Sequence, residues 1–340
     1  MKRLLTLLIL QLFFNDFGIA QYKRDIEGSR SMENGKLITE LDAKKDIYSR
    51  IKILKKEKSY GLIKGAIHFK TIDVGAALLG KGQGRTNVVS YAMLEGITEA
   101  DMNEIAVQFH TSFTEKLNNL GFTQLDWSQI ESAKKYPNLK EKAVDKLESN
   151  KSIGNYTVFT VDNRPHFKLP GGNLGTFNNM KSISKEIGAP LLSYDIIVDF
   201  ARFDIEASRW RTDGYGPGYD FVTTNTSANI LPQIGIESIL QDSGPLPILF
   251  YSGINVLDAV GRFDDVRIQR NLYVYENYAL DIDSYKGEIP ASMKRLITIN
   301  TSNTGTFVVK ADKEKYKRIV LQALDTFSDY LIESIQNEIQ

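Results

Sequence analysis

Two long amphipathic segments constrain the fold of this chain more than any other feature. Residues 99–120 and 313–336 both place apolar side chains at the spacing of one helix face, which predicts two helices that bury a stripe in a common core. Thr98 and Asp101 form a capping-box pattern before the first helix, and Gly121 suits its C-terminal end. The stripes consist of Met102, Ile105, Ala106, Phe109, Phe113, Leu117 and Leu120, and of Tyr316, Ile319, Val320, Ala323, Leu324, Phe327, Tyr330, Leu331 and Ile335.

The segments between these helices have the β-branched and aromatic patterns of strands. Strand-like runs are 62–74, 87–94, 122–127, 155–162, 191–207, 219–230, 266–283 and 297–310. The predicted fold class is therefore α+β, with helices packed on a mixed or antiparallel sheet and with loop and hairpin insertions. Shorter features are turns at 75–84, 212–218 and 303–305, a bulge near Ala201, helices at 44–58, 128–135 and 180–187, a charged helical stretch at 138–150, and loops or short pieces at 165–175 and 231–263.

The composition excludes several classes of protein. The 340 residues include 42 basic and 42 acidic side chains, so no basic domain for nucleic acid is expected. The absence of cysteine excludes disulfides, cysteine-bound zinc, iron–sulfur clusters and a thiol nucleophile.

The N-terminus has the layout of a signal peptide. Lys2 and Arg3 precede an apolar run over 4–14, which is too short to span a bilayer, and Gly18 and Ala20 place small residues before a cut. We expect cleavage after Ala20 and export to the periplasm or an outer-membrane-associated location in a Gram-negative-type envelope. The predicted organisation is a signal peptide at 1–20, a polar segment at 21–60, and one α+β domain at 61–340 with insertions at 138–175 and 231–265. The lysines of the polar segment are interpreted as a solvated face, with contact to anionic lipid as the alternative.

Motifs for catalysis are nearly absent. The glycine loop at 75–84 resembles a phosphate-binding loop, but Gly82 stands where serine or threonine must ligate magnesium. No Gly-x-Ser-x-Gly elbow is present, and the segment after Asp281 departs from a calcium loop at its glycine and at its twelfth position. No cofactor is predicted, and a non-enzymatic role is favoured.

Histidines and strand carboxylates are the remaining candidates for chemistry. His68, His110 and His166 are far apart in the sequence, so no metal site is predicted, and His110 is expected to be solvated. His166, in a loop beside two glycines, is the weak candidate for a catalytic residue. Asp195 and Asp199 share a strand face roughly 13 Å apart, at about 3.3 Å per residue, which we interpret as a solvated face.

An apolar run framed by prolines and glycines is the predicted interaction site. Exposed apolar patches mark contact surfaces, and this run is expected to form no regular core element. The interaction residues are Ile248, Leu249, Phe250 and Tyr251, with Tyr215 and Tyr219 from the aromatic turn at 212–221.

The order of elements resembles the curli-secretion-channel (CsgG) and TolB-N-terminal-like family of envelope proteins. The similarity is greatest at 109–130, where a helix ends in Leu-x-x-Leu-Gly-Phe and passes through Leu125-Asp126-Trp127 into another helix, and at 185–200. It covers about 150 residues and lacks the family's lipobox cysteine. In that family, hairpins extended from the sheet build a membrane channel. The hairpin at 194–230 is acidic for lipid contact, because of Asp195, Asp199, Asp204, Asp213 and Asp220.

These features favour an envelope scaffold or an assembly and secretion accessory protein that acts through protein contacts. The expected partners are envelope proteins or further copies of the chain, with peripheral membrane contact left open and nucleic acid not expected. Two alternatives remain: an exported hydrolase with a site near His166, and a periplasmic ligand-binding module that uses Tyr215, Tyr219 and Phe221.

Overall fold

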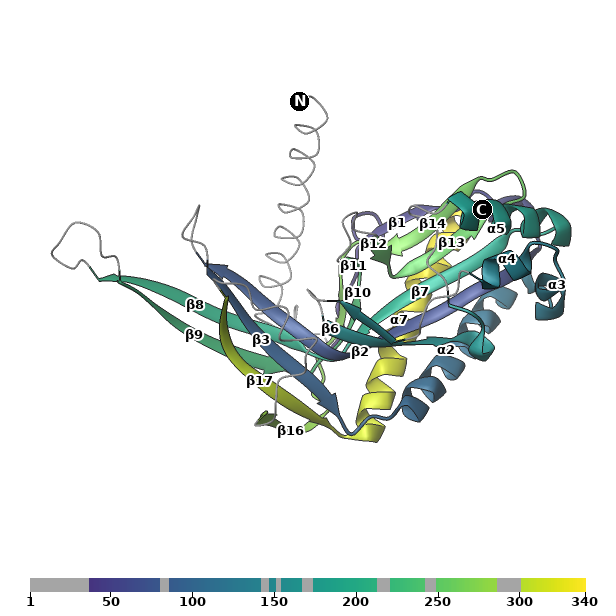
Figure 1. Cartoon of the computed structure of the whole chain (residues 1–340). Helices are drawn as coiled ribbons and strands as arrows, with labels where there is room; N and C mark the ends of the chain where they lie inside the picture. The colour runs from purple at the N-terminus through teal and green to yellow at the C-terminus, as the bar shows by residue number, and fades with distance from the viewer. Residues whose placement is uncertain are drawn as a thin grey trace, which may run out of the picture.

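The structure is a computed structural model in which a large sheet is flanked by helices and continued by two long hairpins (Figure 1). It describes residues 37–79, 86–141, 147–150, 154–166, 174–212, 221–241, 249–285 and 301–340, and for some of them, including 76–79, 86–89, 204–212 and 221–229, only the backbone. The predicted signal peptide and its cleavage site lie outside these residues. No helix in the described ranges has both the length and the apolar character needed to cross a bilayer.

The main sheet is mixed, which confirms the α+β prediction. Its strands lie in the order β1 (Ile47–Arg50), β14 (Phe263–Ile268), β13 (Gly253–Leu257), β7 (Leu191–Asp199), β2 (Ser59–Leu79), β3 (Thr86–Glu95), β17 (Thr301–Ala311) and β16 (Ala279–Ser284). Strand β2 runs parallel to β7, and β3 runs parallel to β17. Side branches are β4 (Thr123–Gln124), β5 (Leu147–Asn150), β6 (Gly154–Thr160), β10 (Ile234–Glu237) and β15 (Leu272–Val274).

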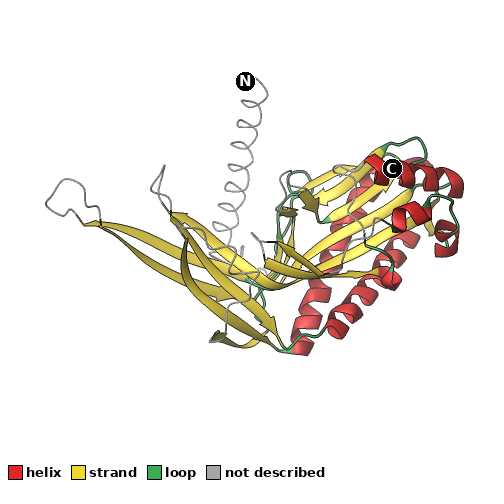
Figure 2. Cartoon of the chain, in the orientation of Figure 1, coloured by secondary structure: helices red, strands yellow, loops and turns green. Residues whose placement is uncertain are grey.

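Helices cover both faces of the sheet (Figure 2). On one face, α2 (Glu99–Asn119) and α7 (Lys313–Ile339) pack over the even-numbered side chains of β7, such as Tyr194 and Ile196. On the other face, α3 (Trp127–Glu131), α4 (Tyr136–Lys140) and α5 (Leu174–Ile187) pack at one end, around Leu191. Short 3-10 turns are η2 (Leu54–Lys56) and η4 (Val161–Asn163).

The two long helices form as their apolar stripes predict. Thr98 and Asp101 make the capping box, and Gly121 follows α2 with a φ of 89°, a conformation that favours glycine. Phe113 of α2 and Phe327 of α7 are buried in the same apolar cluster, together with Phe109, Leu117, Ile319 and Leu324.

Two hairpins extend from the body. The distal half of β2 leaves β7 and pairs with β3, while β8 (Arg202–Thr212) pairs with β9 (Phe221–Leu231) in a separate two-stranded sheet. Figure 1 shows both hairpins reaching away from the helices. This confirms the predicted hairpin. The long strand predicted at 191–207 is divided in two, however, because β7 ends at Asp199 and the first hairpin strand begins at Arg202. The break falls at the position near Ala201 where a bulge is predicted. The predicted turn at 212–218 lies mostly outside the described residues.

Several local predictions are wrong. Residues 44–58 form β1 and η2 rather than a helix: Ile47 and Ile51 are buried, but Ile47 pairs with β14. Strand β2 continues to Leu79 and so includes all of the described part, 75–79, of the predicted glycine turn. The predicted turn at 303–305 is a register shift within a continuous β17.

Further corrections concern short elements. Pro137, predicted to end a helix, lies in the first turn of α4, where proline is tolerated. Of the described residues in the stretch 138–150, only 138–140 are helical, at the end of α4, and 147–150 form strand β5 where a charged helix was predicted. Residues 231–263 supply strands that include β10, β13 and the separate pair β11 (Ile239–Gln241) and β12 (Leu249–Tyr251), and 266–283 is divided among β14, β15 and β16.

Candidate functional site

Ionisable side chains line the face of β2 and β7 that does not contact α2 and α7. Lys64, His68 and Lys70 come from alternate positions of β2, and Asp195 and Asp199 come from β7. Asp195 is 3% exposed and Asp199 is 5% exposed. The interpretation of these two carboxylates as a solvated face is therefore wrong. They were misread because their charge partners lie more than a hundred residues away in the sequence.

The first group on this face is a balanced ion pair. The Lys64 ammonium lies 2.6 Å from Asp195 Oδ1, and His68 Nε2 lies 2.8 Å from the same oxygen. Burial alone would raise the pKa of Asp195, but the Lys64 ammonium and His68 outweigh it and lower that pKa to about 2. Asp195 therefore stays ionised beside the Lys64 ammonium across the neutral range.

His166, the catalytic candidate, lies beside this group and is 1% exposed. Its ring centroid is 5.5 Å from that of His68, so the fold brings together two histidines that the sequence separates by nearly a hundred residues. Thr160 Oγ1 donates to the carbonyl of Arg164, and the Arg164 guanidinium lies 4.2 Å from the centre of the Trp127 ring. These contacts hold the loop against the sheet, where the His166 side chain is almost fully buried.

His110 differs from its predicted solvated state. Its Nδ1 lies 3.3 Å from the Tyr194 hydroxyl, and burial lowers its pKa to about 4. No group of three or more histidine, aspartate or glutamate side chains in the described part of the chain is arranged to hold a metal ion.

The second ionic group surrounds Lys70. Its ammonium donates to Asp73 Oδ1 at 2.8 Å, to Asp199 Oδ2 at 2.9 Å and to Glu237 Oε1 at 2.8 Å. Lys70, Asp73 and Asp199 are each 5% exposed or less, while the Glu237 side chain is 18% exposed. We call these four residues the Lys70 cluster. It holds three carboxyl groups and one ammonium, so it is not balanced as the Lys64 pair is.

A sequence signal for both groups exists, although it forms no known catalytic or metal-binding motif. Three basic side chains occupy the same face of a long, otherwise mostly apolar strand, and two aspartates alternate with isoleucine in a second one. Buried charges need partners, so such strands are candidates for neighbours with facing charges. The pattern cannot say which lysine meets which aspartate, because that depends on the register of β2 and β7.

Only three of the predicted interaction residues, Leu249, Phe250 and Tyr251, are among the described residues. Ile248, Tyr215 and Tyr219 lie outside the described residues, and for Leu249 and Phe250 the backbone alone is described, in β12. Tyr251 ends β12, and the Arg267 guanidinium lies 4.0 Å from its ring centre. The run at 249–251 therefore forms a strand paired with β11, in place of the irregular segment that the prolines suggest.

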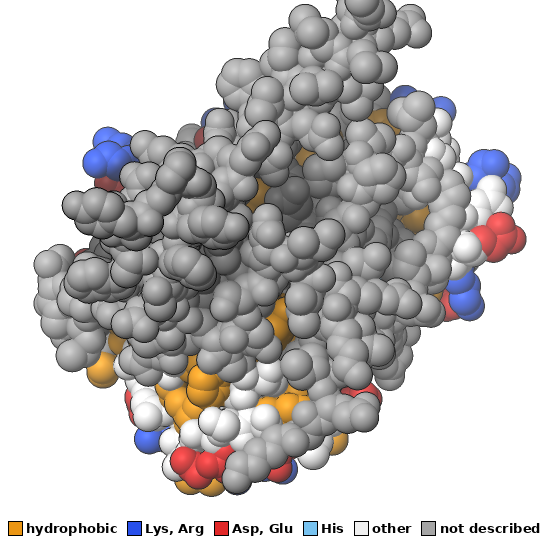
Figure 3. Space-filling model, turned by 60° about the vertical axis from the view of Figure 1, so that its left-hand side comes forward, with side chains coloured by type: hydrophobic (Ala, Val, Ile, Leu, Met, Phe, Trp, Pro, Cys, Tyr) orange, Lys and Arg blue, Asp and Glu red, His pale blue; other side chains and the backbone are white. Residues whose placement is uncertain are grey.

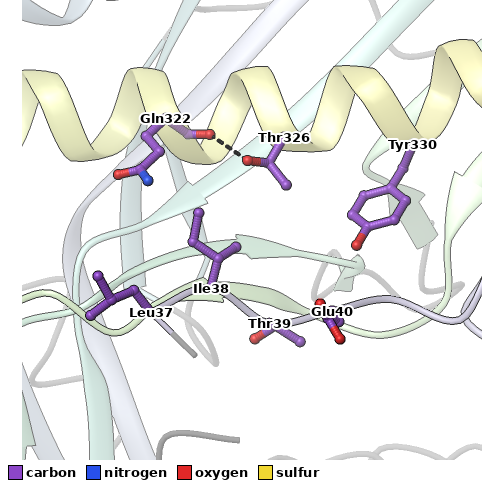
Figure 4. Close-up of a pocket in the computed structure, with 7 residues that line it drawn as sticks. All are labelled: Leu37, Ile38, Thr39, Glu40, Gln322, Thr326 and Tyr330. Carbon is purple, nitrogen blue, oxygen red and sulfur yellow. Dashed lines mark hydrogen bonds between the residues drawn. The ribbon is translucent and has the colours of Figure 1, made fainter. Parts of the chain in front are cut away.

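A pocket of about 340 Å³ lies between the first described residues and α7 (Figure 4). It is lined by Leu37, Ile38, Thr39, Glu40, Gln322, Thr326 and Tyr330. The Tyr330 hydroxyl also accepts a hydrogen bond from the backbone N–H of Leu41 at 3.1 Å, which ties this segment to α7. The lining contains one carboxylate and no histidine, so it does not present the acid–base pair that a hydrolase needs.

The hairpins are the other candidate feature. In the described part of the chain, neither β8 nor β9 pairs with a further strand, so each has one edge whose backbone groups have no strand partner. The hairpin contacts β2 near its root, where Phe203 packs on Gly75 so closely that an added Cβ would lie 2.3 Å from the Phe203 ring. Figure 3 views the molecule from the hairpin side, where described apolar side chains form patches and described charged side chains lie toward the outline.

Neither the scan against protein-family models nor the search of curated proteins finds a match to this chain.

Proposed function

We propose that this protein is a non-enzymatic scaffold or assembly subunit of the cell envelope, exported after cleavage at Ala20, and that it acts through contacts made by its two hairpins. The expected partners are envelope proteins or further copies of the same chain. The proposal draws on the resemblance to the CsgG and TolB-N-terminal-like family, in which hairpins extended from the sheet build a membrane channel.

The observation that carries the proposal is the pair of unpaired edges on β8–β9. The ladder joins eleven residue pairs, from Arg202 with Leu231 to Thr212 with Phe221, and spans roughly 35 Å at about 3.3 Å per residue. A two-stranded hairpin of this length is marginal alone, and its open edges are templates for pairing with another chain. A partner strand would satisfy those edges and stabilise the hairpin.

The acidity argument against hairpin contact is weaker than the sequence suggests. Asp195 and Asp199 belong to β7 and are buried, so two of the five acidic residues counted there are not on the hairpin at all. The alternative of a hydrolase with a site near His166 has less support, because the His166 side chain is only 1% exposed.

Single-cysteine cross-linking tests the proposal directly, because the natural chain has no cysteine. Ser208→Cys on β8 and Asn225→Cys on β9 each place one thiol on a hairpin strand, and Val107→Cys places one on the exposed side of α2 as a matched control. Each variant is expressed with its natural export sequence, and intact cells are treated with a short bifunctional maleimide.

We expect the hairpin thiols to give covalent adducts with a second chain and the α2 thiol to give few or none. Mass spectrometry of the adduct distinguishes a second copy from another envelope protein. Equal or absent cross-linking at all three positions, in variants that are exported and folded, would contradict the proposal.

A further inference from the structure

The Lys70 cluster lies at the roots of both hairpins. Lys70 and Asp73 lie where β2 exchanges its partner β7 for β3, which is the start of the first hairpin. Asp199 is the last residue of β7, directly before the second hairpin begins, and Glu237 is the last residue of β10, the first strand after that hairpin. One buried ammonium therefore joins both ends of β8–β9 to the base of β2–β3.

Charge counting shows that the cluster must hold at least one proton at its carboxyl groups. With all three carboxyl groups ionised, the single ammonium would leave a net charge of −2 in a site that is almost closed to water. Unpaired buried charge is strongly unfavourable, and protonation is the usual way in which a protein avoids it.

The other charged groups that the structure describes around the cluster have partners of their own. Around the cluster, the neighbouring titratable or charged groups of the described elements are His68 on β2, Asp195 on β7, Arg202 on β8, Tyr156 on β6, Tyr278 just before β16, and Tyr316 in α7. His68 faces Asp195, and the Arg202 guanidinium lies 4.2 Å from the Tyr273 ring centre while donating to Gln233. Burial raises the pKa of Tyr278 and Tyr316, so both phenols stay neutral.

The proton is held near neutral pH. Burial and the nearby Asp199 carboxylate raise the pKa of Asp73 to about 7, in spite of its hydrogen bond from Lys70. Burial also raises the pKa of Glu237 well above its usual value. The pKa of Lys70 is likewise held well above its usual value, because its three carboxyl partners outweigh the burial that would lower it.

We propose that the Lys70 cluster is a proton-controlled lock for the hairpins: the protonated cluster holds β8–β9 against the root of β2–β3, and loss of its proton loosens that contact. Ionisation adds a negative charge that Lys70 does not offset among Asp73, Asp199 and Glu237, so these groups repel one another across the two roots. The lock is a property of the single chain and does not depend on the partner contacts proposed above.

The test is a distance measurement between spin labels in the full exported chain. Labels on Asn225→Cys in β9 and Val107→Cys in α2 report the position of the hairpin relative to the body. We expect a narrow distance distribution at about pH 6 and a broadened or shifted one at about pH 8.5, because the cluster loses its proton between them.

Two further variants decide the origin of any change. Asp73→Asn keeps an acceptor oxygen for Lys70 but cannot ionise, so it should keep the distribution narrow at both pH values. Asp265→Asn on β14 is the matched control: burial also raises the pKa of Asp265, but this strand lies away from the hairpins, so the pH response should match that of the parent protein.

A parent distribution that does not change with pH, or a pH response that persists in Asp73→Asn, would overturn the lock. If Asp73→Asn does not fold, Glu237→Gln takes its place, with a reduced pH response expected and an unchanged one contradictory.

Discussion

Two buried ionic groups lie on the same face of the same two strands, yet they differ in charge balance and in place. The Lys64 pair matches one ammonium with one carboxylate and lies over the body, next to the loop that carries His166. The Lys70 cluster gathers three carboxyl groups around one ammonium and lies where both hairpins begin. The comparison teaches that a buried charge can fix a structure when it is balanced and can make it respond to protons when it is not.

Removing each lysine should separate the two groups, with the largest effect at Lys70. Lys70→Met leaves three carboxyl groups without a cation, and breaking a buried charge group in this way costs on the order of 3–5 kcal/mol. Lys64→Met leaves Asp195 with its hydrogen bond to His68, so a loss of about 1–3 kcal/mol is expected.

Urea unfolding at neutral pH measures both losses. Equal losses for the two variants, or a larger loss for Lys64→Met, would show that the acidic excess does not distinguish the groups.

The acid limb of the stability curve should depend on the Lys64 pair. The pKa of Asp195 is about 2 in the folded protein and 3.8 in its ordinary state, so its contribution is present above about pH 4 and is lost as the pH falls toward 2. The difference corresponds to about 2 kcal/mol. Asp195→Asn should remove this limb in pH-dependent unfolding.

His110 affects stability over a separate pH range, above that of Asp195. Its pKa is lowered from 6.5 to about 4, so the unfolded chain binds the proton first and stability falls as the pH drops between those values. A loss of stability above pH 4 that persists in Asp195→Asn is therefore expected, since it belongs to His110. If the stability of Asp195→Asn falls below pH 4 as steeply as that of the parent protein, the role assigned to Asp195 is contradicted.

The contact between the hairpins should be sensitive to a single added carbon. The Phe203 ring occupies the space that a side chain at Gly75 would need, so Gly75→Ala forces one strand to move. Overpacking of this kind costs about 1–2 kcal/mol here. The control is Ala76→Gly, next to Gly75 in β2, because it removes volume and adds none. Gly121→Ala would be unsuitable, since the positive φ at Gly121 strains any other residue. The rate of proteolytic cleavage within 202–231 should increase in Gly75→Ala. In Ala76→Gly it should rise no more than the overall loss of stability of that variant explains.

Local patterns allowed much of the fold to be predicted. The helix stripes and the capping box depend on spacing within a few residues, and those elements are where the sequence places them. The hairpin was also predicted, but its first strand begins at Arg202 and not within a continuous strand from Leu191. Short elements were mistaken where tertiary pairing decided the outcome: Ile47 and Ile51 have helical spacing but are buried through a strand that pairs with β14.

The candidate site could not be predicted in the same way. Asp199 and Lys70 meet only because β2 and β7 run parallel in one register, and Glu237 joins them from β10. Alternating aspartate and isoleucine is typical of a half-solvated strand as well as of one that faces buried lysines. The basic residues at alternate positions of β2 are compatible with the second case, but only the fold shows which carboxylates they meet.

Hydrogen exchange resolved by residue, measured from about pH 6 to about pH 8.5 and corrected for the intrinsic rate, compares the two regions most directly. The amides of β8–β9 should lose protection above about pH 7 while those of β13 and β14 keep theirs, and Asp73→Asn should abolish the difference. Parallel loss in both regions, or unchanged protection of the hairpin across this range, would contradict a proton-dependent hold on the hairpin roots.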